Sequence, residues 1–73
     1  MTVGELISIL ENYDEDMEVR IGMIQNYGSN FAKDIYEVEE HSINAWYEDN
    51  YNAVVITEGS QLGTVNYSDD EEW

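Results

Sequence analysis

Carboxylates are the side chains through which this chain could do chemistry: 17 Asp and Glu stand against 2 Lys and Arg, a formal charge of −15. Alternating carboxylates can hold calcium, and Asp14, Asp16 and Glu18 superficially resemble a calcium loop. Val19, however, occupies the glycine position of such a loop, and Gln25 occupies its bidentate glutamate position. We therefore expect no dedicated metal site and no cofactor, while a loose divalent-cation site stays open wherever carboxylates cluster.

Catalytic residues are scarce by comparison. The chain has no cysteine, one histidine (His41) and no Gly-x-Ser-x-Gly motif, so the usual nucleophile and base pairs are missing. A glycosidase-like carboxylate pair is compatible with the residue types, but a ligand pocket of about 300 Å³ is hard to form in so small a core. We expect that the protein is not an enzyme and that His41 is a surface residue.

The acidic residues fall into four groups along the chain: a corner after the first predicted element, a middle strand, a hairpin turn and the C-terminal tail. We predict that they contact a partner through Asp14, Glu15, Asp16, Glu18, Asp34, Glu37, Glu39, Glu40, Glu48, Asp49, Asp69 and Asp70. Solubility alone is served by a net charge of about 2 to 8, and further charge adds self-repulsion. The excess charge therefore favours a function over mere solvation.

A helix is predicted at the start of the chain. Thr2 and Glu5 have the spacing of a capping box, and apolar residues then recur at helical spacing with a stripe widened by Ile9. We predict an amphipathic helix over residues 3–12, which ends before the acidic turn at residues 14–16.

Alternation of apolar and polar residues predicts strands at 17–23 and 34–40, with Tyr36 and Val38 facing inward. Residues 43–47 either prolong the second strand or form a short one, and residues 48–50 form a hairpin turn. The β-branched run 53–57 is typical of the most buried strand. Turns are expected at 25–33 and between Gly59 and Gly63, and residues 64–67 are expected to add an edge strand.

These elements predict an α+β fold, in which one N-terminal amphipathic helix packs on a small, mostly antiparallel sheet of three to four strands. The chain is too short for two cores, so residues 1–68 form one domain and residues 69–73 an acidic tail. The absence of cysteine, of a signal-peptide pattern and of a long apolar run indicates a cytoplasmic protein.

The aromatic residues have two interpretations. Trp46 is expected in the core, and packing is the favoured role for Tyr36 and Tyr67. The tyrosines at 13, 47 and 51 fit packing and partner contact equally well. Trp73 either docks on its own domain or on a partner.

The opening residues 1–7, with Leu10, Tyr13, Asp16, Val19 and Ile21, are similar to the start of many small phage and prophage proteins. Those begin with a Thr-x-x-Glu-Leu helix, an acidic turn and a Val-x-Ile strand. The likeness covers about the first third of the chain, which lacks the proline frequent in that turn. The small size and acidity also resemble phage-encoded DNA mimics that inhibit host defence nucleases, the anti-CRISPR and anti-restriction proteins.

This compositional resemblance implies an inhibitor that occupies the cationic channel of a basic nucleic-acid-binding protein. A CRISPR effector is the favoured target, and a restriction enzyme is the other one. The charge itself opposes direct binding to nucleic acid and to anionic membranes. The alternative is a small acidic module or oligomerising adaptor that binds a basic protein without mimicking nucleic acid. Either a monomer or a homodimer fits.

Overall fold

The computed structural model describes residues 1–23 and 30–67, in which one helix and three strands follow the order α1 (Val3–Leu10), β1 (Val19–Gly22), β2 (Phe31–Ile43) and β3 (Tyr51–Thr64). The predicted α+β fold is confirmed. The sheet has the order β1-β3-β2, so that β3 lies in the centre. β2 and β3 are antiparallel, and β1 runs parallel to β3.

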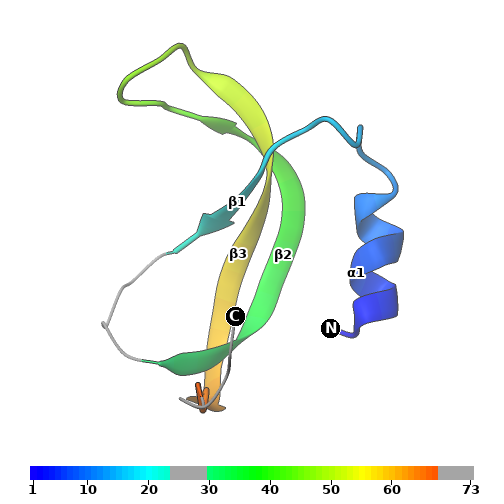
Figure 1. The fold of residues 1–73 in the computed structure, drawn as a ribbon, viewed down its shortest axis with the longest axis vertical. Coiled ribbons are helices and arrows are strands. Elements are labelled where there is room, and N and C mark those ends of the chain that lie inside the picture. The colour runs from blue at the N-terminus through cyan, green and yellow to red at the C-terminus, as the bar shows by residue number, and fades with distance from the viewer. Residues whose placement is uncertain (24–29, 68–73) are drawn as a thin grey trace.

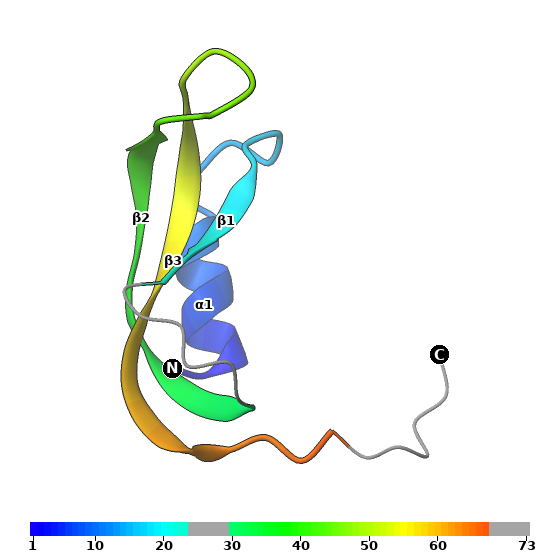
Figure 2. The same ribbon diagram turned by 90° about the vertical axis from the view of Figure 1, so that its left-hand side faces the viewer.

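The predicted capping box starts α1. The Glu5 backbone N–H donates to Thr2 Oγ1 at 3.1 Å, and the Thr2 N–H donates to Glu5 Oε1 at 2.7 Å. The helix covers one face of the sheet (Figures 1 and 2). Leu6, Ile9 and Leu10 are half-buried, but no residue of α1 is fully buried, so the helix is held loosely.

The core is centred on β3. Its fully buried residues in the described part of the chain are Val38, Ala53, Val54 and Val55. Val54 pairs with Val19 of β1 on one side and with Glu40 of β2 on the other. The β-branched run therefore forms the most buried strand, as predicted, because strands flank β3 on both sides.

Several local predictions were wrong. Gly59 and Gly63 lie within β3 rather than around a turn, and residues 64–67 add no strand of their own, since β3 itself ends at Thr64. Register shifts in β2 between Ala32 and Glu37 let the strands curve, and a Cβ at Gly59 would lie 3.2 Å from the Asp34 carbonyl oxygen. The predicted turn at 25–33 lies largely outside the described residues, and its last part is wrong because residues 31–33 begin β2. The acidic tail at 69–73 lies outside the described residues.

The helix found in the described residues, α1, is not long and apolar enough to cross a membrane.

Candidate interaction surface

The acidic corner between α1 and β1 is an ordered turn. The Asp16 backbone N–H donates to Asp14 Oδ1 at 3.3 Å, and the Met17 N–H donates to the Asp14 carbonyl at 3.0 Å. Asp14, Glu15 and Asp16 are all exposed. The turn therefore presents three carboxylates to solvent on a backbone held by its own hydrogen bonds.

The connection between β2 and β3, residues 44–50, is the second acidic loop, and we call it the hairpin tip. Asn50 braces it: its Oδ1 accepts from the Ala45 N–H at 3.1 Å, and its Nδ2 donates to Asn44 Oδ1 at 3.3 Å. Glu48 and Asp49 are exposed on this braced loop.

The fold brings the corner and the hairpin tip to the same end of the sheet (Figure 1). They share a polar groove of about 450 Å³, to which Glu18 contributes from the corner and Glu48 and Asp49 from the tip. Arg20 and Tyr51 also line it. Two acidic groups that are separate in sequence thus form one surface.

Arg20 is held within this polar groove by its own neighbours. Its Nε donates to the Tyr51 hydroxyl at 2.9 Å, its Nη1 donates to Glu18 Oε1 at 3.1 Å, and its guanidinium lies 5.6 Å from the Tyr51 ring centroid. The hydrogen bond with Tyr51, followed by that with Glu18, raises the pKa of Arg20 above its ordinary value. The cation is therefore partly neutralised within the groove.

Lys33, the other cation, lies along the β2–β3 pair. Its Nζ is 2.9 Å from Glu58 Oε1, and the side chains are 20% and 10% exposed. Both cations of the chain are thus paired with carboxylates, and of the two only Arg20 lies in the groove between the corner and the hairpin tip.

The middle-strand group is divided by the strand alternation. Glu37 and Glu39 share the face of the sheet away from α1, whereas Glu40 is on the opposite face and accepts a hydrogen bond from Asn52 Nδ2 at 3.0 Å. Asp34 lies near the start of α1, beside Glu5 and Ile35. The predicted cluster is therefore spread over several surfaces, and Asp69 and Asp70 lie outside the described residues.

Sequence reasoning missed a candidate metal-ligand set on β2. His41 Nε2 is 2.9 Å from Glu37 Oε2 and 3.8 Å from Glu39 Oε1, and the ligand atoms of the three residues lie within 4.8 Å of one another. Their i, i+2, i+4 spacing was the available signal, because alternate residues of a strand share a face. The set could hold a divalent cation, although the hydrogen bond between His41 and Glu37 already accounts for the shortest of its distances.

The structure corrects the expected positions of several aromatic residues. Trp46 is 89% exposed rather than buried in the core, and Tyr36 and Tyr67 are 73% and 69% exposed rather than packed. Tyr47 is 94% exposed at the hairpin tip, whereas Tyr51 is half-buried against Arg20. Trp46 and Tyr47 directly precede the predicted turn at residues 48–50, and this proximity was the sequence signal for the exposed tip.

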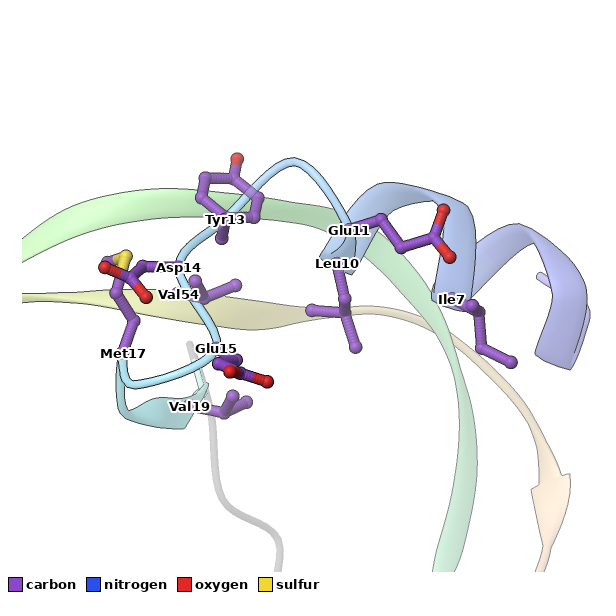
Figure 3. Close-up of a pocket in the computed structure, with 9 residues that line it drawn as sticks. All are labelled: Ile7, Leu10, Glu11, Tyr13, Asp14, Glu15, Met17, Val19 and Val54. Atoms are coloured by element: carbon purple, nitrogen blue, oxygen red, sulfur yellow. The ribbon is translucent and has the colours of Figure 1, made fainter.

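An apolar groove of about 580 Å³ separates α1 from the sheet. Figure 3 shows Leu10 of α1 on the side of the groove toward Val19 and Val54, Ile7 further along the helix, and acidic side chains at the edge. The residues at that edge are Glu11, Asp14 and Glu15. The groove is thus apolar inside and anionic at its rim.

No protein-family model, curated protein or solved structure matches this chain.

Proposed function

We propose that the protein is a phage-type inhibitor that mimics the charge of nucleic acid. It occupies the cationic DNA- or RNA-binding channel of a defence enzyme, most suitably a CRISPR effector, in the cytoplasm of an infected bacterium. The observation that supports this is the meeting of Glu18 with Glu48 and Asp49 at one end of the sheet. Arg20 offsets part of this charge through its pair with Glu18, but three carboxylates line the groove against this one cation, so this end stays anionic.

The dimensions and charge of the molecule are comparable with those of duplex DNA. Its longest extent is 38 Å, a length of duplex that carries about 22 phosphate charges. The chain has 17 carboxylates. Its radius of gyration of 14.5 Å exceeds the value of about 11 Å expected for a compact chain of this length. The charge is therefore spread over a body of 38 × 31 × 28 Å, which is larger than a compact chain of this length would be.

Carboxylates can replace phosphates chemically. Arg binds either group in bidentate geometry, and charge-assisted hydrogen bonds are stronger than neutral ones. Association driven by such contacts is fast and weakens with salt.

The direct test presents the purified protein to a panel of CRISPR effectors and restriction nucleases, and measures DNA binding and cleavage at low and high salt. We expect one enzyme to lose both activities, with inhibition weaker at high salt. Simultaneous binding of DNA and this protein to the enzyme, or an affinity independent of salt, would contradict mimicry.

Two matched double variants test the charge surface itself. Glu48→Gln with Asp49→Asn removes two charges from the hairpin tip, and Glu39→Gln with Glu40→Gln removes two from β2. We expect both to weaken inhibition, by roughly tenfold for the tip, because exposed carboxylates at a cationic interface contribute about 1 kcal/mol or more. Wild-type inhibition by both variants would refute the proposal.

The apolar groove favours the second candidate, a module that binds a basic protein without mimicking nucleic acid. Its apolar walls and acidic rim complement an amphipathic segment rich in Lys and Arg. Ile7→Ser and Val19→Ser leave the charge unchanged at side chains that are 51% and 47% exposed. Loss of partner binding in these variants, with the tip charges dispensable, would establish the module instead of the mimic.

A further inference from the structure

The hairpin tip carries the two most exposed large hydrophobic side chains in the described part of the chain, Trp46 at 89% and Tyr47 at 94%. Aromatic side chains of this size usually bury their rings in a core or an interface. Exposed adjacent rings are typical of the residues that contribute most to binding a partner.

Hydrogen bonds within the loop hold the segment that carries these rings. Asn50 ties the tip together through hydrogen bonds with Ala45 and Asn44, and the last β2–β3 pair, Ile43 with Tyr51, closes its base. A loop that is already ordered loses less conformational entropy when it binds. The tip is therefore suited to insert its rings into a partner.

Carboxylates adjoin the rings on the same loop. Glu48 and Asp49 follow Tyr47 directly, and Glu18 lies across the polar groove. Arg20 is already paired with Glu18 and stacked near Tyr51, so its charge is partly compensated. The tip thus combines flat aromatic faces with negative charge, as an unpaired nucleotide does.

We propose, on the basis of the function proposed above, that the hairpin tip imitates unstacked nucleotides. Trp46 and Tyr47 replace bases, and Glu48 and Asp49 replace phosphates. The partner site is then a groove for single-stranded nucleic acid, in which aromatic or Arg side chains stack on bases along a cationic track.

A duplex-binding cleft fits the tip less well. In a duplex the base faces are stacked on one another, and proteins contact phosphates and base edges. Exposed ring faces have no counterpart there. Single-stranded grooves, in contrast, gain roughly 1 to 3 kcal/mol from each stacked base.

The test uses the enzyme that the panel shows to be inhibited, with labelled single-stranded and duplex oligonucleotides as competitors. Trp46→Ala with Tyr47→Ala should weaken inhibition by at least about 30-fold, the effect of losing two stacking contacts. Trp46→Phe with Tyr47→Phe should retain most of it. Wild-type protein should displace the single strand more readily than the duplex.

The matched control is Tyr36→Ala with Tyr67→Ala, which removes two exposed rings elsewhere, 73% and 69% exposed. We expect wild-type inhibition from it, and equal unfolding midpoints by circular dichroism for both double variants.

The outcomes separate this inference from the proposed function. If the tip alanine variant inhibits like the control while the Glu48 and Asp49 variant does not, the nucleotide imitation is wrong and charge mimicry stands. If the wild-type protein displaces the duplex but not the single strand, the nucleotide imitation is also wrong and charge mimicry stands. If no enzyme of the panel is inhibited, the proposed function and the role of the tip are both overturned.

Discussion

Two regions of the molecule differ in how firmly they are held: the β2–β3 hairpin and the segment before it, residues 1–23 with α1 and β1, which we call the arm. The hairpin contains every fully buried residue of the described chain and the half-buried pair of Lys33 with Glu58. In the arm, α1 buries no residue completely, and β1 pairs over only four residues. Stability is therefore concentrated in the hairpin, which also carries the exposed tip proposed to bind the partner. The proposed binding loop is therefore attached to the element that holds the core.

The largest expected effect on stability comes from shortening a buried valine of the hairpin, with an exposed valine of the arm as its control. Val54→Ala in β3, where the side chain is 1% exposed, should lower the free energy of unfolding by about 2 to 3 kcal/mol. Val3→Ala in α1, 76% exposed, should change it by less than about 0.5 kcal/mol. Urea unfolding followed by circular dichroism measures both, and equal losses would remove the distinction between hairpin and arm.

The two ion pairs give a second comparison. Lys33→Met leaves the carboxylate of Glu58, 10% exposed, without its cation and should cost about 2 kcal/mol of unfolding free energy. Arg20→Met breaks the pair with Glu18, which is 64% exposed, and should cost much less, because solvent screens exposed ion pairs. The same urea titration applies. A larger loss for Arg20→Met would place more of the stability in the arm.

The seam between the arm and the hairpin is the pairing of β1 with β3, and Gly22 tests it. A Cβ there would lie 2.9 Å from Val55 Cγ1, so Gly22→Ala should push β1 away from β3 and cost about 1 to 2 kcal/mol. Gly63→Ala is the control, because nothing lies within 4 Å of its Cβ position. Faster amide exchange in β1 but not in β2 would confirm a local effect. Unchanged exchange in β1 would show that the seam accommodates the methyl group.

The smallest expected effect is in the helix cap. Thr2→Ala removes the acceptor for the Glu5 N–H and should reduce helix stability by about 1 kcal/mol or less. We expect loss of helical circular dichroism at an unchanged global midpoint. A lowered midpoint would show that α1 unfolds together with the sheet.

The cap also predicts a pH dependence. The hydrogen bond from the Thr2 backbone N–H lowers the pKa of Glu5 from its ordinary value of 4.5. The pKa of Glu5 is lower in the folded protein than in the unfolded chain. The stabilisation that the Glu5 carboxylate gives to the helix is therefore complete above pH 4.5 and is lost as the pH falls through the folded pKa. The difference in helical signal between wild type and Glu5→Gln should therefore vanish in acid. A difference that persists there would rule out the charge of Glu5 as its cause.

Predictions from local pattern succeeded where the interactions are local. The capping box needs only Thr2 and Glu5, and the β-branched run needs only its own residues to favour a buried strand. Inward and outward alternation correctly separated Val38 from Glu37 and Glu39. It failed for Tyr36, because the register shifts between Ile35 and Glu37, and at such an irregularity simple alternation no longer assigns a side chain to a face.

The sequence by itself determined the charge, the helix start and the identity of the central strand, since these depend on composition and on residues close in the chain. Only the tertiary structure decided which carboxylates meet. Glu18 lies in one groove with Glu48 and Asp49 because β1 pairs in parallel with β3. Glu40 and Glu39 lie on opposite faces of the sheet because adjacent residues of a strand point in opposite directions. The tertiary structure also placed Trp46 in solvent, because the loop extends beyond the last β2–β3 pair and no other element of the described residues lies over it.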